Sequence, residues 1–286
     1  MIVLTWSAVL LALAAIGYGV LTVYGRHAWS TATRARLAQV DANRVDPAVT
    51  LYQRDEIAGA PAPVRRYLAA VLREGQPIVA AARLEHHGTF NLSAAGERWK
   101  PFTSSETIVT SRPAFLWDGR VAVMPGVPAL VHDAYVAGRG AMRATLFGLF
   151  ALANCEDGRE LAQGELMRFL AEGAWYPTAL LPSQGVRWQA IDGRTARATL
   201  TDGTLSVTLT FHFNDADLID TVRADARGRI TDGKVEMLPW EGRFWNYAQR
   251  DAMRVPLEGE VAWITPAGRR PYWRGTLDST RYEFAH

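Results

Sequence analysis

The sequence predicts a mainly β protein of the α+β class. A large, curved, antiparallel sheet of half-barrel type wraps around a central helix pair, and a transmembrane helix precedes it. Three observations predict this fold. The first 24 residues contain no charged side chain. From residue 78 onward, hydrophobic and polar residues alternate in many short runs, as in half-buried strands. Two long apolar runs, 138–154 and 160–176, interrupt that series and read as helices.

The first 24 residues, MIVLTWSAVLLALAAIGYGVLTVY, are long enough to cross a bilayer. A helix of this length extends about 36 Å, which exceeds the hydrocarbon thickness. A cleaved signal peptide is the alternative, but it typically carries basic residues before a shorter apolar core. Arginines follow the span instead, at positions 26, 34, 36 and 44. The positive-inside rule therefore predicts a single-pass protein of the bacterial inner membrane with its domain in the cytoplasm.

Three segments are expected along the chain: a membrane anchor over 1–24, a polar and partly helical linker over 25–59, and one mainly β domain over 60–286. The linker is rich in arginine and alanine, and 30–45 within it has a weak helical stripe. A short amphipathic helix is predicted over 64–72, where Gly75 and Pro77 end it.

Eleven runs have the composition and spacing of strands. They are 83–90, 105–111, 114–123, 129–137, 186–192, 194–200, 204–213, 218–226, 240–249, 258–265 and 271–284. The clearest is TLSVTLTFHF, which follows an Asp-Gly turn and completes a hairpin over 194–213. A long meander of strands has to curl or close. The two apolar runs at 138–154 and 160–176 are suited to fill that curl.

Composition excludes several classes of function. The net charge is +2 and the basic residues are scattered, so no nucleic-acid partner is expected. A single cysteine excludes an intrachain disulfide and a thiolate metal site. His86 and His87 are neighbours on a predicted strand and point to opposite faces. Because no zinc, nucleotide or nucleophile-elbow motif occurs either, we expect no metal and no cofactor.

Four stretches resemble a bacterial family known only as a domain of unknown function. They are WDGRVAVMPGVPALVHDAYVAGRGAM, AQGELMRFLAEGAWYPTALLP, PWEGRFWNYAQRDAMRVPLEGEVAW and PYWRGTL, and the resemblance spans about residues 60–284. It implies a membrane-associated protein without an assigned reaction. A looser architectural likeness is to lipoprotein-carrier and lipoprotein-sorting folds, which implies a hollow that holds acyl chains.

Glu172 lies in the apolar stretch RFLAEGAWYPTALLP and has two interpretations. Glu165, Arg168 and Glu172 share one helix face, which favours a structural ion-pair ladder. Alternatively, Glu172 is a carboxyl in a pocket walled by Trp175 and Phe169, where burial raises its pKa for proton transfer.

Arg139 and Arg143 are candidates for an anion such as a lipid headgroup phosphate. They lie in GRGAMR, which is predicted to follow a strand and open a helix. The alternative is a tight turn that simply needs Gly138 and Gly140.

Trp245 and Tyr247 belong to WEGRFWNY. At a period of two they share one strand face with Glu241 and Arg243, which suits the wall of a wet cavity or an interface.

Three functions follow as hypotheses. The first is a binding module, whose sheet-enclosed hollow takes a lipid or other apolar ligand near the membrane. The candidate ligand-binding residues are Arg139, Arg143, Glu172, Trp175, Trp245 and Tyr247. The second is a hydrolase of a membrane-borne substrate that uses Glu172, Asp133 or His132, which requires these side chains to lie together. The third is a scaffold that assembles through an aromatic surface patch.

Overall fold

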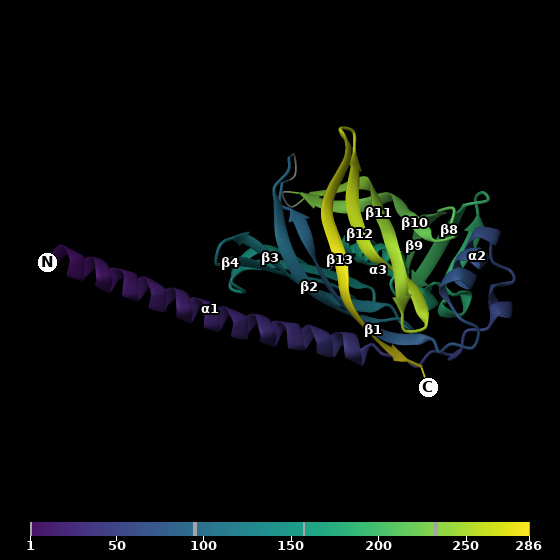
Figure 1. The fold of residues 1–286 in the computed structure, drawn as a ribbon, viewed down its shortest axis with the longest axis horizontal. Helices are drawn as coiled ribbons and strands as arrows, with labels where there is room; N and C mark the ends of the chain where they lie inside the picture. The colour runs from purple at the N-terminus through teal and green to yellow at the C-terminus, as the bar shows by residue number, and fades with distance from the viewer. Residues whose placement is uncertain (1, 94–95, 157, 232–233, 286) are drawn as a thin grey trace.

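A computed structural model describes residues 2–93, 96–156, 158–231 and 234–285. These residues form one antiparallel sheet of thirteen strands that curves without closing, since its edge strands do not pair with each other (Figure 1). In spatial order the strands are β6 (Phe150–Glu156), β5 (Arg139–Leu146), β4 (Val127–Val136), β3 (Ala114–Met124), β2 (Trp99–Val109), β1 (Val79–Asn91), β13 (Gly268–Phe284), β12 (Met253–Thr265), β11 (Lys234–Arg250), β10 (Ile219–Thr231), β9 (Leu205–Phe213), β8 (Thr195–Asp202) and β7 (Arg187–Ala190).

The sheet consists of two meanders joined along β1 and β13. Helix α3 (Arg159–Glu172) links the last strand of the first meander, β6, to the second and lies inside the curve. The short helix α2 (Ala62–Val71) and three 3₁₀ turns, Arg54–Ile57, Pro177–Leu180 and Pro182–Gln184, complete the domain. Each of the eleven predicted strands overlaps an observed strand, and the curved sheet that wraps a helix is confirmed.

The expected helix pair is wrong in its first member. Residues 138–154 form the hairpin β5–β6, so α3 is the one helix that the described strands enclose. Strand β4 offers its free edge to β5, and the hairpin turns at Phe147 and Gly148, both with positive φ. Pairing with a neighbouring strand thus overrides the helical tendency of an alanine- and leucine-rich run.

Helix α1 (Ile2–Ala42) continues without a break through the predicted span and most of the predicted linker. Over Val9–Ala42 it is long and apolar enough to cross a membrane. Its first half projects away from the domain (Figure 1), whereas its second half lies on the convex face of the sheet. There Val40 packs in a small core with Leu116 and Ala134.

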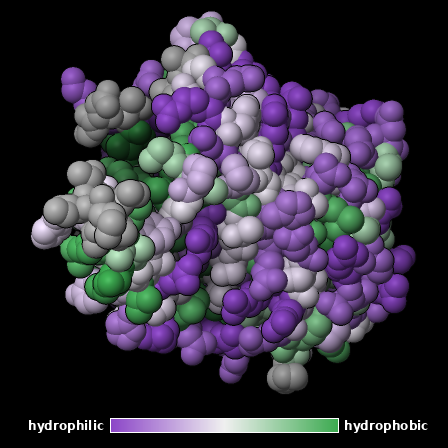
Figure 2. All heavy atoms as spheres, turned by 60° about the vertical axis from the view of Figure 1, so that its left-hand side comes forward, coloured by the Kyte–Doolittle hydropathy of each residue, from purple (hydrophilic) through white to green (hydrophobic). Residues whose placement is uncertain are grey.

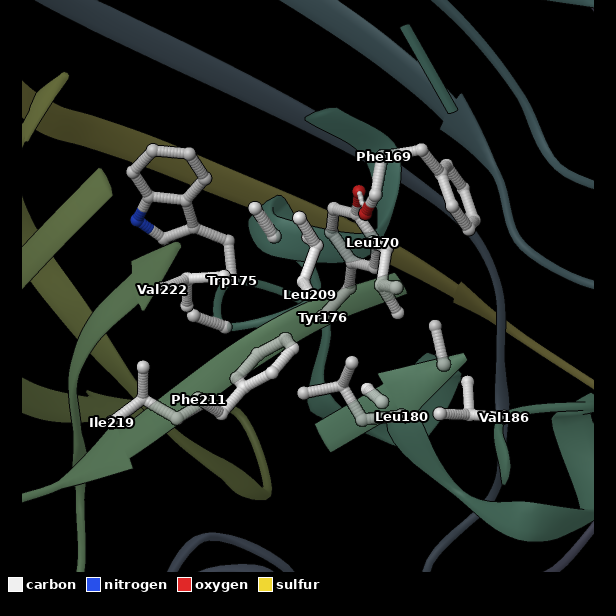
Figure 3. Close-up of a cluster of buried hydrophobic side chains, with 14 of the residues drawn as sticks. Phe169, Leu170, Trp175, Tyr176, Leu180, Val186, Leu209, Phe211, Ile219 and Val222 are labelled. Carbon is white, nitrogen blue, oxygen red and sulfur yellow. Dashed lines mark hydrogen bonds between the residues drawn. The ribbon is translucent and has the colours of Figure 1, made fainter. Parts of the chain in front are cut away.

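The main core lies between α3 and the concave face. Phe169 and Leu170 of α3 pack with Leu209 and Phe211 of β9, as Figure 3 shows. These side chains alternate along the strand and recur along the helix, so each element turns one apolar face to the other. Packing against β9 holds α3 inside the curve of the sheet. The opposite face of the helix is turned toward β4 and β5.

Candidate functional site

A partly open cavity of about 360 Å³ lies between one side of α3 and the concave face of the sheet. Its size falls within the range of small-molecule sites. The wall is mainly apolar and rich in rings: Phe90, Trp117, Trp175, Trp240, Phe244, Tyr272 and Trp273. The indole N–H groups of Trp175 and Trp240 donate to Pro256 O and Tyr272 Oη, each at 3.0 Å. These two rings therefore have their donors satisfied within the protein.

A second hollow of about the same size adjoins this cavity. The two share a wall that includes Phe90, Tyr272 and Arg227, and the second reaches the exposed residues Gly96 and Arg270. The adjoining hollow leads from the cavity toward the ends of strands β1 and β12. A ligand has a route from the surface to the aromatic wall.

Arg168 of α3 organises a buried charge cluster at the cavity wall. Its three guanidinium nitrogens donate to Glu172 Oε1 at 2.7 Å, Asp133 Oδ2 at 2.8 Å and Glu106 Oε1 at 3.0 Å. The guanidinium also lies 5.0 Å from the ring of Phe115, within cation–π distance. Each of the three nitrogens of Arg168 thus donates one hydrogen bond within the protein, and the arginine positions three carboxyl groups.

A second buried pair, Glu165 and Arg227, stands beside the first. Arg227 Nη2 lies 3.3 Å from Glu165 Oε1, and its guanidinium stacks over Trp240 at 5.0 Å. Burial and the neighbouring Asp133 carboxylate raise the pKa of Glu165 to about 8. Burial and the Glu172 carboxylate raise the pKa of Glu106 well above its ordinary value. At neutral pH Glu165 therefore holds its proton, and Glu106 ionises less readily than an ordinary glutamate.

The cluster offers acceptors to a ligand. Two arginines face four carboxyl groups, and the proton on Glu165 lowers the negative charge of the cluster at neutral pH. Two further buried oxygens, Asp133 Oδ1 and Glu172 Oε2, have no hydrogen-bond partner in the described part of the chain. Unmet acceptors of this kind are costly unless a donor reaches them. The arrangement suits a hydroxyl or ammonium group better than an anion.

Of the predicted ligand-binding residues, Glu172 and Trp175 line the cavity. Both interpretations of Glu172 describe part of its surroundings. It is an ion-pair partner of Arg168 four residues earlier, as the ladder requires, and it also borders an apolar hollow beside Trp175.

Arg139 and Arg143 lie elsewhere, because the segment that they occupy is strand β5 and not the start of a helix. Arg143 turns to the convex face, where its guanidinium lies 6.0 Å from the ring of Trp29 in α1. Arg139 is exposed at the start of the strand. Gly140 allows the close approach of α3, since a Cβ there would lie 2.8 Å from the backbone nitrogen of Ala162. The glycines of this segment serve turn and packing, and the predicted helix that begins at this segment is wrong, whereas anion binding by Arg139 or Arg143 stays a prediction.

Trp245 and Tyr247 do not share a face. The intervening Asn246 has a φ of 56°, although the register with β12 is the same before it, at Trp245 and Glu258, and after it, at Tyr247 and Pro256. Trp245 is exposed and donates to Glu258 Oε2, whereas the Tyr247 hydroxyl donates to Ile219 O at 2.7 Å beside the core. Neither residue lines the cavity.

The proposed hydrolase residues are not assembled either. Asp133 and Glu172 both reach Arg168, but His132 leaves β4 on the convex face and stacks on Trp29 of α1 at 3.9 Å. By the requirement that the three lie together, this hypothesis is wrong. His86 and His87 point apart as predicted, with His86 buried between Trp175 and Trp273 and His87 exposed near Asp278.

Arg227 and Glu106 are cavity-cluster residues that pattern reasoning missed. Glu106 carries a usable signal, because it alternates with Phe102 and Ile108 on the buried face of β2. A charge at an inward position needs a buried partner. Arg227 follows a register shift in β10, so its face cannot be read from alternation.

Comparisons with known proteins give distant structural likenesses. A crystal structure of a LolA superfamily protein from Nitrosomonas europaea aligns over 82% of this chain and 94% of its own, at 8% identity and a TM-score of 0.39. A β-barrel-like protein of domain of unknown function DUF1849 from Brucella abortus aligns over 72% and 99%, at 11% identity and a TM-score of 0.21. Neither likeness is close enough to carry an argument about function. No curated protein matches the sequence. The model of a family of unknown function, DUF6920, matches residues 58–282, and the chain therefore belongs to that family.

Proposed function

We propose that the protein is a membrane-anchored binding module whose cavity takes a lipid or another amphipathic molecule. The observation that carries the proposal is the partly open cavity, whose walls are aromatic and aliphatic and whose α3 side carries buried acceptors. The apolar part of the ligand lies against Trp175, Trp240 and Trp273. Its polar group donates hydrogen bonds to Asp133 or Glu172.

The ligand's polar group follows from the charge cluster. Arg168 already donates to three carboxyl groups, and a phosphate would lie against those groups as well as against the arginine. A hydroxyl or an ammonium donates where the cluster lacks donors. This differs from the anionic headgroup expected near Arg139 and Arg143, because those arginines lie outside the cavity.

The anchor in this proposal is the first part of α1, with residues 1–24 in the bilayer. Arg26, Arg34 and Arg36 follow it and favour a cytoplasmic domain. A reporter that is active only outside the cytoplasm, fused to the C-terminus, tests this orientation. The fusion is expected to be inactive, and an active fusion would contradict it.

Co-purification tests the binding itself. The full-length protein, extracted without added lipid, is examined by native mass spectrometry, and its organic extract is analysed for lipids. We expect one bound amphipathic molecule per chain. The full chain is needed because the second half of α1 packs on the sheet.

Two tryptophan variants separate the cavity ligand from lipid that adheres to α1. Ala144→Trp places bulk in the cavity wall, and Ala141→Trp places the same bulk on the same strand without lining the cavity. The bound molecule is expected to be lost from Ala144→Trp and kept by Ala141→Trp. Equal amounts in both variants would mean that the cavity is not the binding site.

A further inference from the structure

The turns of the first meander meet α1 within and directly after its uncharged part. The Tyr18 hydroxyl donates to Gly126 O of the β3–β4 turn at 2.7 Å. Gly25 lies so close to the β5–β6 turn that a Cβ there would collide with Phe147 O. Tyr18 precedes the end of the uncharged segment by six residues, which is about 9 Å of helix. If residues 1–24 cross the bilayer, both turns are at the level where the span leaves it.

These turns have the composition that such a position requires. The β3–β4 turn is Met124, Pro125, Gly126 and Val127, and residues 144–153 read ATLFGLFALA, without a charge in either. Met124, Phe150 and Leu152 are 58%, 56% and 56% exposed. Exposed apolar side chains in such a contiguous group mark an interaction surface. Figure 2, in which the left-hand side of Figure 1 comes forward, shows hydrophobic side chains gathered on one side of a mostly hydrophilic face.

We propose that the β3–β4 and β5–β6 turns and strand β6 insert into the surface of the lipid bilayer beside α1. This inference rests on the proposed anchor. Insertion into the bilayer explains why residues 138–154 are too apolar for an exposed hairpin. Their hydrophobic side chains contact lipid, and the segment does not have to be a helix packed inside the sheet. Leu152 both lines the cavity and is exposed on edge strand β6. The same contact therefore brings the cavity wall to the membrane from which a lipid would come.

Depth-dependent quenching tests this surface. The native cysteine is replaced by Cys155→Ser, and single cysteines are introduced at Phe150, Met124, Leu11 and Ile191 in the full-length protein. Each is labelled with an environment-sensitive fluorophore, and the protein is reconstituted into phosphatidylcholine–phosphatidylglycerol vesicles with and without brominated acyl chains. Ile191 is the matched control, because it is an exposed hydrophobic residue near the opposite edge of the sheet, next to β7.

We expect brominated chains to quench the Phe150 and Met124 labels at least twofold and to leave the Ile191 label unchanged. Quenching at Leu11 alone would overturn the inference while leaving the anchor in place. If the Leu11 label is not quenched, the anchor itself is wrong and the inference falls with it. A cysteine at Leu152 repeats the measurement on β6 should a turn variant fail to fold.

Discussion

His132 and Asp133 are consecutive residues of β4 whose side chains serve opposite faces of the sheet. Asp133 accepts a hydrogen bond from Arg168 at 2.8 Å on the cavity side. His132 stacks on Trp29 and lies 2.8 Å from Thr33 Oγ1 on the side of α1. One strand thus connects the charge cluster of the cavity to the surface on which α1 packs.

Removing the centre of the cluster is expected to destabilise the domain. Arg168→Met leaves Glu106, Asp133 and Glu172 without their shared partner, and breaking a buried ion pair in this way costs about 3–5 kcal/mol. Chemical denaturation of the variant at pH 7 measures the loss. Arg54→Met is the control, because it breaks an exposed pair with Glu74 and is expected to cost under about 1 kcal/mol. Equal losses in the two variants would contradict a structural role for the cluster.

Stability is expected to fall as the pH rises from about 5 to about 8. Glu165 keeps its proton in the folded state up to a pKa of about 8, whereas the unfolded chain releases it near the ordinary value of 4.5. Between these values the folded state binds more protons, so the free energy of unfolding decreases with pH.

Glu165→Gln mimics the protonated acid and is expected to flatten part of that decline. The remainder belongs to Glu106, whose pKa is raised as well. The denaturation midpoints of the unsubstituted protein and of Glu165→Gln, measured at several pH values, give the pH dependence of stability for each. An identical slope in the variant would show that Glu165 does not titrate in this window.

Contact between α1 and the β5–β6 turn is expected to depend on Gly25. A leucine there collides with Phe147 O, and relief of such overpacking costs about 1–3 kcal/mol. Gly25→Leu should therefore loosen the second half of α1 and speed tryptic cleavage after Arg34 and Arg36 several-fold. Gly19→Leu is the matched control on the same helix, since no other part of the chain lies within 4 Å of a Cβ at that position. Unchanged cleavage in Gly25→Leu would mean that the helix does not dock there.

The left-handed backbone position at Asn246 is expected to tolerate glycine and reject β-branched residues. Its φ of 56° is in the left-handed region, which glycine adopts freely and valine does not. Asn246→Val should cost about 1–3 kcal/mol, and Asn246→Gly should be nearly neutral. Thermal denaturation ranks the two. A valine variant as stable as the glycine variant would contradict the left-handed conformation at this position.

Period-two alternation was sufficient to find eleven strands and the curl that they form. Alternation did not predict the structure of the segments whose secondary structure depends on their surroundings and not on their local sequence. Residues 138–154 are apolar along their whole length, so alternation is absent and a helix is the natural interpretation. Pairing with β4 decides otherwise, and in our proposal the lipid surface accounts for the apolar turn.

The site was predictable only in part for a related reason. Glu172 and Trp175 follow from a charge and a ring in an apolar helical stretch, and both line the cavity. Glu106, Asp133 and Arg227 come from strands far apart in the sequence and meet at the cavity wall only through the curvature of the sheet. Trp245 and Tyr247 were assigned to one face because alternation assumes extended backbone throughout, and the positive φ of Asn246 between them breaks that assumption.

The central claim is that the cavity holds the apolar part of a ligand. Crystals of the full-length protein soaked with a long-chain alcohol, brominated at the end of its chain, test it most directly. We expect an anomalous bromine peak among the rings of Trp175, Trp240 and Trp273, with the hydroxyl toward Asp133 or Glu172. Bromine found only around α1 or on the outer surface, with side chains filling the cavity, would contradict the account.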